Sequence, residues 1–169
     1  MVNIFRKEVD KEKYFIVTYE LESETSLRDA SWQLAIGQSV GNPNVRNSWE
    51  TDDLFNNHSC IILHNEEELT KTKKGIVKIA FPTINIDFKT DGISHLLVNI
   101  MGGQMDIDNI LKCAVIDIWF PKHIEDIFLG PKFGIEGIRE FTGVKDKPLF
   151  GAIVKPKIGI SPQTLLEMV

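Results

Sequence analysis

The chain has 169 residues, of which 43% are hydrophobic and 25% are charged, and its net charge is −5 at pH 7. These values are typical of one ordinary globular domain, or of a small domain and the start of another. No apolar run approaches the ~20 residues of a membrane-spanning helix, and the dispersed lysines lack the contiguous basic face that nucleic-acid binding needs. The charged opening residues contain no apolar signal-peptide core, so we expect a cytoplasmic protein that contacts neither membrane nor nucleic acid.

Aromatic and β-branched residues in loose alternation predict a first strand over residues 13–22. An apolar stripe at helical spacing then predicts a helix over 23–41, with Ser23 or Thr25 as its N-cap and Gly41 at its end. The chain therefore begins with a strand followed by a helix.

Two further strands are predicted at 59–67 and 75–83, and the charged segment between them is interpreted as an exposed turn. Residues 91–103 predict a second helix, because an aspartate precedes their apolar stretch and two glycines end it. A fourth strand, 111–121, ends at a proline. The order strand, helix, strand, strand, helix, strand is that of the split βαβ or ferredoxin-like fold. We thus expect an α+β domain with two helices on one face of a four-stranded antiparallel sheet.

The residues that follow indicate a second part of the chain. Pro121 is expected to end an N-terminal domain of residues 1–121, and the Gly- and Pro-broken segment 122–148 to act as a connector. Residues 149–169 combine a buried-type strand with the start of a helix. Such a pair is the first step of a βα repeat and not a finished domain.

Two cations end the strand of this second part. Lys155 and Lys157 follow the apolar run 149–154, and their spacing puts both amines on the same side of an extended chain. The next helix is predicted to begin with Ser161 at its N-cap and Pro162 at its first position.

Residue types that commonly bind metals are scattered along the sequence. Cys60 and Cys113 are far apart and form no CxxC pattern, so neither a disulfide framework nor a zinc site is indicated. The four histidines also lack ligand-like spacing: His58, His64, His95 and His123. We interpret them as surface or satisfied core residues and predict no metal site within this chain.

The stretch GPKFGIEGIREFTGVKDKPLFGAIVKPKIGISP, residues 130–162, closely resembles the large subunit of ribulose-bisphosphate carboxylase (RuBisCO) and the RuBisCO-like proteins. In that family an N-terminal α+β domain precedes a TIM (β/α)8 barrel, so residues 149–169 would be the first strand and the start of the first helix of a truncated barrel. By this resemblance, Lys155 moves a proton at the carbon next to the substrate carbonyl, and Lys157 supports the same chemistry. A lysine beside another cation and partly desolvated loses basicity, which suits it to act as a base.

Two residues of the N-terminal domain match family positions as well. The segment LLVNIMGG resembles the one whose asparagine reaches the substrate and metal region, which implies that role for Asn99. The segment IGQSVGNPN resembles a family loop whose last hydroxyl residue helps hold a substrate phosphate, and Asn42 occupies that place. Gly37 stands where carboxylases have a glutamate, and Asn99 where the RuBisCO-like enolases of methionine salvage have a lysine. Both departures point away from those two activities.

The resemblance implies Mg-dependent enolisation of a phosphorylated sugar or sugar acid, as an isomerisation, a tautomerisation or a carboxyl exchange. It places the magnesium ligands outside residues 1–169 and implies a homodimer whose active site is shared between subunits. We therefore expect the 169 residues alone to be inactive. Two alternatives stay open: a true ribulose-1,5-bisphosphate carboxylase/oxygenase, and a non-catalytic binding or regulatory protein of the same fold.

Overall fold

The computed structural model describes residues 3–42, 47–103, 106–128, 130–151 and 161–168. The chain divides into two compact units, Met1–Phe128 and Leu129–Val169. No helix in the described ranges is both long and apolar enough to cross a membrane.

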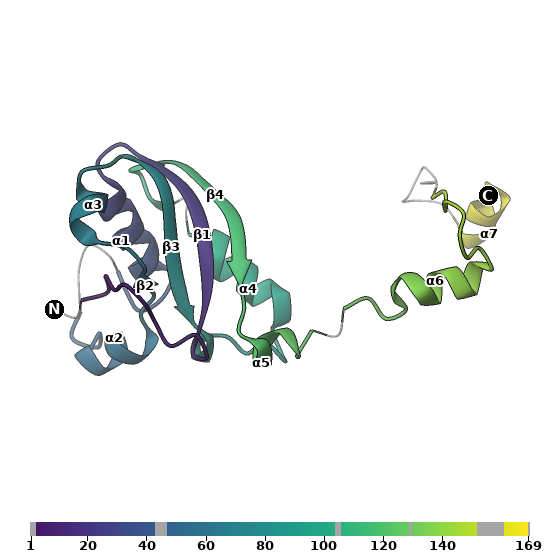
Figure 1. Cartoon of the computed structure of the whole chain (residues 1–169), viewed down its shortest axis with the longest axis horizontal. Helices are drawn as coiled ribbons and strands as arrows, with labels where there is room; N and C mark the ends of the chain where they lie inside the picture. Colours follow the sequence, from purple (N-terminus) through teal and green to yellow (C-terminus); the bar gives the residue numbers. More distant parts are fainter. Residues whose placement is uncertain (1–2, 43–46, 104–105, 129, 152–160, 169) are drawn as a thin grey trace. The chain divides into compact units, whose positions relative to one another are not determined.

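A four-stranded sheet forms the centre of the first unit (Figure 1). Its strands are β1 Tyr14–Ser23, β2 Ile61–Ile62, β3 Lys74–Pro82 and β4 Ile110–Trp119. They lie in the order β2-β3-β1-β4, and every neighbouring pair is antiparallel. This is the predicted ferredoxin-like arrangement, so the α+β class is confirmed. The strand predicted at 59–67 is much shorter than expected, because only two of its residues pair with β3.

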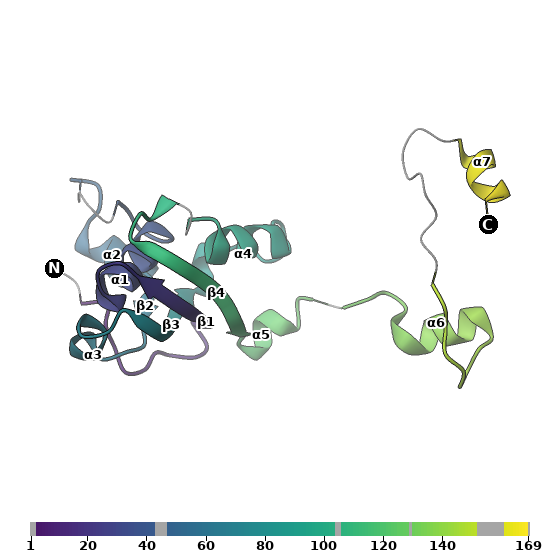
Figure 2. The same cartoon turned by 90° about the horizontal axis from the view of Figure 1, so that it is seen from above.

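The described residues of the first unit form six short helices, and the α-helices among them are labelled in Figures 1 and 2. They are α1 Leu27–Gly37, α2 Asp52–His58, α3 Glu66–Thr70, the 3-10 helix η1 Thr83–Asn85, α4 Gly92–Met101 and α5 Lys122–Glu125. Helices α1 and α4 are the two predicted ones, while α2 was not predicted. Helix α3 occupies the charged segment interpreted as a turn, and that interpretation was wrong: Asn65 caps the helix and Leu69 is buried beneath it.

The N-terminus of α1 is capped by Ser26, whose Oγ accepts a hydrogen bond from the Asp29 N–H at 3.1 Å. The predicted caps, Ser23 and Thr25, were wrong, because Ser23 is still the last residue of β1. Ser26 has the extended backbone and the side-chain oxygen that an N-cap needs. The helix therefore begins a few residues later than predicted.

The core lies between the sheet and the helices because β1 alternates strictly. Phe15, Val17, Tyr19 and Leu21 are fully buried, while the residues between them are partly exposed. The Phe15 ring is packed by three other aromatic rings: Phe81, Phe88 and Phe120, with ring centroids 5.2, 6.1 and 5.7 Å away. The Tyr19 hydroxyl donates to the carbonyl of Ile100 in α4 at 2.7 Å, so this helix is attached to the sheet by a buried hydrogen bond.

The opposite face of the sheet carries two ion pairs. Glu20 of β1 pairs with Lys112 of β4 at 2.7 Å, and Glu22 pairs with Lys74 of β3 at 3.2 Å. Lys74, Glu22 and Lys112 lie opposite one another in register and form one row of alternating charge, and Glu20 reaches Lys112 diagonally.

The described part of the second unit contains two helices, α6 Gly134–Thr142 and α7 Pro162–Glu167. Helix α6 ends at Gly143, whose φ of 70° is the left-handed conformation that favours glycine at this position. Helix α7 begins as predicted, with the Ser161 Oγ accepting from the Thr164 N–H at 3.1 Å. The strand predicted at 149–154 is not confirmed, since residues 149–151 are not in a strand and 152–154 lie outside the described residues.

Candidate functional site

A polar cavity of about 410 Å³ lies where α1, α2, η1 and α4 meet in the first unit. Most of its lining side chains carry hydrogen-bonding groups: Gln38, Ser39, His58, Asn85, His95 and Asn99. Three apolar residues complete the described lining: Val40, Leu54 and Ile84. Neither a carboxylate nor a lysine or arginine is among these lining residues, so the cavity offers neutral donors and acceptors, together with two imidazoles.

Helix α4 brings Asn99 to this cavity. Its half-buried side chain uses one Nδ2 hydrogen to donate to the carbonyl of His95, one turn earlier in the helix, at 3.1 Å. The second hydrogen and the carbonyl oxygen of the amide are not used in this bond. Asn99 therefore carries both a donor and an acceptor toward a ligand, as its predicted substrate-binding role requires.

Gln38, directly after α1, holds the end of α4. In the amide orientation that satisfies both of its neighbours, its nitrogen donates to the carbonyl of Asn99 at 2.9 Å and its oxygen accepts from the N–H of Gly103 at 3.1 Å. A side chain at Gly103 would occupy the space of this amide, so glycine is required there while Gln38 stays in place. The backbone of Asn99 is thus fixed relative to the end of α1.

The two histidines of the cavity come from different helices. His58 ends α2 and faces Asn85 of η1 through its Nδ1, which lies 2.7 Å from the Asn85 Oδ1. His95 lies on α4 with its Nδ1 3.4 Å from an Asp91 carboxylate oxygen. Both histidines are partly exposed and line the polar cavity, and their interpretation as surface or satisfied core residues stays a prediction.

Asn42 is not among the residues that line this cavity. It is exposed, and its backbone N–H lies 3.4 Å from the Glu50 Oε1, which also accepts from the Asn47 Nδ2 at 2.7 Å. The buried Glu50 carboxylate packs so tightly against Gly41 that an added Cβ would lie 2.5 Å from its carboxyl carbon. Glu50 thus contacts the backbone at Gly41 and Asn42. Asn42 does not line the cavity that Asn99 lines.

The two predicted catalytic lysines, Lys155 and Lys157, lie outside the described residues. Their role remains a prediction. Gly37, for which the sequence resemblance implies a glutamate in carboxylases, is the last residue of α1, and a Cβ built there would meet no atom within 4 Å. Space for a side chain is present at this position, but the carboxylate is not.

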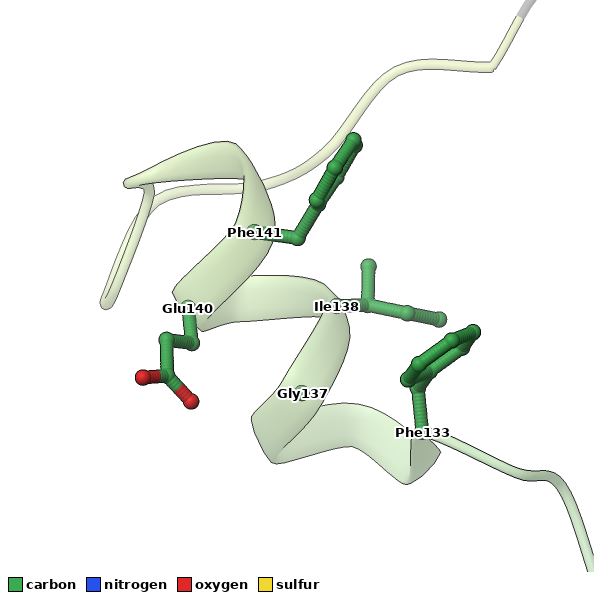
Figure 3. Close-up of a pocket in the computed structure, with 5 residues that line it drawn as sticks. All are labelled: Phe133, Gly137, Ile138, Glu140 and Phe141. Atoms are coloured by element: carbon green, nitrogen blue, oxygen red, sulfur yellow. The ribbon is translucent and has the colours of Figure 1, made fainter.

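A second cavity, of about 550 Å³, lies along α6 in the second unit. Figure 3 shows the side chains of Phe133, Ile138 and Phe141 on one side of this helix and Glu140 on another. Phe141 is 92% exposed. Apart from Glu140, the described lining is apolar, so this surface lacks the set of converging polar groups that acid–base chemistry needs.

The described residues do not form a cluster of metal ligands. Among the described ranges, no group of three or more His, Cys, Asp and Glu side chains is arranged to hold a metal ion. Magnesium prefers oxygen ligands in octahedral geometry, and the amides and imidazoles of the polar cavity do not provide that set. The described residues therefore do not form a magnesium site by themselves.

Taken together, the strand order β2-β3-β1-β4 and the helices α1 and α4 define an α+β domain of ferredoxin-like topology. Residues 6–124 match the family model for the ribulose bisphosphate carboxylase large chain, N-terminal domain. The chain belongs to this family, in which RuBisCO and RuBisCO-like proteins both occur.

Curated relatives with different names match the chain. It is 36% identical over 91 residues to a ribulose bisphosphate carboxylase of Methanocaldococcus jannaschii, covering 54% of this chain and 21% of the relative. It is 31% identical to a ribulose bisphosphate carboxylase-like protein of Archaeoglobus fulgidus, covering 91% of this chain and 36% of the relative. A 2,3-diketo-5-methylthiopentyl-1-phosphate enolase of Geobacillus kaustophilus is 32% identical, with 85% of this chain and 36% of the relative covered.

Solved structures match the fold over nearly the whole chain. The octameric RuBisCO of Pyrococcus horikoshii has a TM-score of 0.75 at 25% identity, with 97% of this chain and 38% of that chain covered. A dimeric archaeal RuBisCO of Hyperthermus butylicus has a TM-score of 0.71 at 24% identity, with 98% and 38% covered. The chain spans less than two fifths of the length of any of these relatives.

Proposed function

We propose that the protein to which this chain belongs catalyses enolisation of a phosphorylated sugar or sugar acid, by removal of a proton from the carbon next to a carbonyl. The observation that carries this proposal is the Asn99 amide, which lines a polar cavity in a domain of the RuBisCO family. Enzymes named as carboxylases and as enolases are both among the relatives, which supports chemistry at a carbonyl without choosing between them.

Asn99 would bind an oxygen of the substrate, because its amide keeps a hydrogen-bond donor outside the bond to His95. A donor aimed at an oxygen that gains negative charge in the transition state commonly contributes a hundredfold or more to the rate. Gln38 would preserve this geometry by holding the Asn99 backbone. Asn42 would contribute at the phosphate end of the substrate through its side chain.

The remaining roles rest on the sequence resemblance. Lys155 would move the proton and Lys157 would support it, at the end of the first strand of a TIM barrel formed by residues 149–169 and those that follow. Residues 122–148 would connect this barrel to the N-terminal domain. Magnesium would stabilise the enediolate through ligands outside this chain. The 169 residues alone would be inactive, and the protein would act as a homodimer with shared sites.

Proton exchange in deuterium oxide tests the proposal. The protein at its natural length is incubated with ribulose 1,5-bisphosphate and Mg²⁺, and loss of the hydrogen next to the carbonyl is followed by proton NMR. We expect exchange by the wild type and a loss of about a hundredfold in Asn99→Leu. The matched control Ser94→Ala, at an exposed position on the same helix, should exchange at the wild-type rate.

Exchange that Asn99→Leu leaves unchanged would remove the observation on which the proposal rests. No exchange by the wild type would favour the non-catalytic alternative. Incorporation of labelled carbon dioxide into the bisphosphate would instead identify a carboxylase, against which the missing carboxylate at Gly37 stands.

A further inference from the structure

Asn85 holds the imidazole of His58 in a defined orientation. The Asn85 Nδ2 donates to the His58 carbonyl at 2.8 Å, and the Asn85 Oδ1 lies 2.7 Å from the His58 Nδ1. The first bond fixes which end of the amide is nitrogen, since a carbonyl oxygen only accepts. The oxygen of the amide must therefore face the imidazole.

This orientation determines the tautomer of the ring. An amide oxygen has no hydrogen to donate, so the His58 Nδ1 must carry the proton in the 2.7 Å contact. In a neutral imidazole only one nitrogen is protonated, and the other is an acceptor. Neutral His58 is consequently the Nδ1–H form, with the lone pair on Nε2.

The Nε2 lone pair is the group that His58 can offer to a ligand. The half-buried ring lines the polar cavity together with Asn99, and no described residue donates a hydrogen bond to its Nε2. Two titratable residues of other elements line cavities that His58 also borders: His95 of α4 lines the polar cavity, and Lys13 lines a neighbouring one.

We propose that His58 is a ligand-binding residue of the polar cavity, whose Nε2 accepts a hydrogen bond from a hydroxyl group of a bound sugar phosphate. This inference rests on the proposed function, because it takes the ligand of Asn99 to be a phosphorylated sugar. A fixed acceptor selects a hydroxyl group over a carbonyl or ether oxygen at the same place, since only the hydroxyl can donate. His58 would thus help to determine which substrate fits.

A purely structural role is the competing explanation, in which the His58–Asn85 pair only joins α2 to η1. Two substitutions separate the explanations. His58→Asn keeps an N–H donor near the place of Nδ1 and removes Nε2, so it preserves the contact to Asn85 and deletes the proposed ligand contact. His58→Gln instead keeps a polar group near the place of Nε2. His123→Asn, on α5 and outside the polar cavity, is the matched control.

The tautomer is measured first, by nitrogen-15 NMR of the imidazole rings in the protein at its natural length. We expect the neutral His58 ring to be protonated on Nδ1. Binding of ribulose 1,5-bisphosphate is then measured by titration calorimetry. Loss of one hydrogen bond should weaken binding about tenfold in His58→Asn and less in His58→Gln, with no change in His123→Asn.

A neutral ring protonated on Nε2 would overturn the proposal, as would absence of sugar phosphate binding by the wild type or unchanged affinity in His58→Asn. The proton exchange assay keeps this result separate from the proposed function. Exchange by a wild type whose affinity does not depend on His58 would reject this inference alone. Binding that depends on His58 without any exchange would reject the enolisation alone.

Discussion

The side chain of Gln38, at the end of α1, donates to the backbone carbonyl of Asn99 in α4 at 2.9 Å. Through this bond and its partner at Gly103, one amide joins the ends of two helices that are far apart in the sequence. The backbone of Asn99, the proposed ligand-binding residue of α4, is therefore held in place by a residue at the end of α1.

Substitution of Gly103 tests this connection. In Gly103→Ala the new methyl group displaces the Gln38 amide and breaks both of its hydrogen bonds, so we expect the free energy of unfolding to fall by about 1–2 kcal/mol. Urea denaturation measures the change. Gly37→Ala is the control, because a Cβ there meets no atom within 4 Å and alanine favours the helix. Equal stability of the two variants would show that Gln38 does not hold α4.

Tyr19 attaches α4 to the centre of the sheet. Tyr19→Phe removes the hydroxyl that donates to the Ile100 carbonyl and changes little of the ring packing, so we expect a loss of about 1–2 kcal/mol in the free energy of unfolding. Thermal unfolding followed by circular dichroism measures it. Tyr14→Phe, at the start of β1, provides a comparison in which no such bond to α4 is lost. A Tyr19→Phe protein as stable as the wild type would contradict the role of this bond.

The aromatic rings around Phe15 pack together within the hydrophobic core. Phe15→Ala leaves a cavity between Phe81, Phe88 and Phe120, and substitutions of this kind cost about 3–5 kcal/mol. We expect the variant to be largely unfolded or to unfold at much lower urea concentration. Phe141→Ala is the control, since that side chain is 92% exposed on α6, and its unfolding midpoint should match the wild type.

Cys60 gives the first unit a dependence on alkaline pH. Burial raises the pKa of this thiol to about 12, while a hydrogen bond with Ser39 lowers it to a smaller extent. In the unfolded chain the thiol ionises near pH 8.5–9, so above that pH the unfolded state loses a proton that the folded state keeps. Stability is therefore fully present below about pH 9 and falls as the pH rises toward 12.

We expect the free energy of unfolding between pH 9 and pH 10 to decline less in Cys60→Ala than in the wild type, by up to about 1 kcal/mol over this interval. Urea denaturation at both pH values measures the slope. Unfolded tyrosines begin to ionise in the same range, but both proteins retain Tyr19, so its contribution cancels in the comparison. Identical slopes in the two proteins would mean that the buried thiol does not contribute.

The large elements of the first unit could be predicted from the sequence because their apolar periodicity is strong. Strand β1 and helix α4 are examples, since each has several buried residues at the spacing of its own structure. Helices α2 and α3 could not be recognised in this way, because each buries a single apolar residue, Phe55 or Leu69. Their capping residues, Thr51 and Asn65, each precede acidic residues and were the available signal.

The candidate site was less accessible to sequence reasoning. Asn99 is a candidate because of family resemblance, and local periodicity gives no reason to select it. The pairing of His58 with Asn85 joins residues of two different helices, and neither residue stands in a recognisable motif. Such contacts depend on how α2 and η1 are brought together by the sheet, which a single sequence does not specify. The ion pairs of the sheet's open face likewise depend on strand register, which places Glu22 opposite both Lys74 and Lys112.

The strand order has a consequence for how this domain folds during synthesis. Strand β1 is made first but lies at the centre of the sheet, between β3 and β4. Its residue Ile16 pairs with Ala80 on one side and with Trp119 on the other. The first strand is therefore synthesised without a strand partner until β3 has been made, and its other edge stays unpaired until β4 follows. Because pairing of such distant segments is slow, we expect β1 to be the part of the nascent chain most dependent on protection from aggregation.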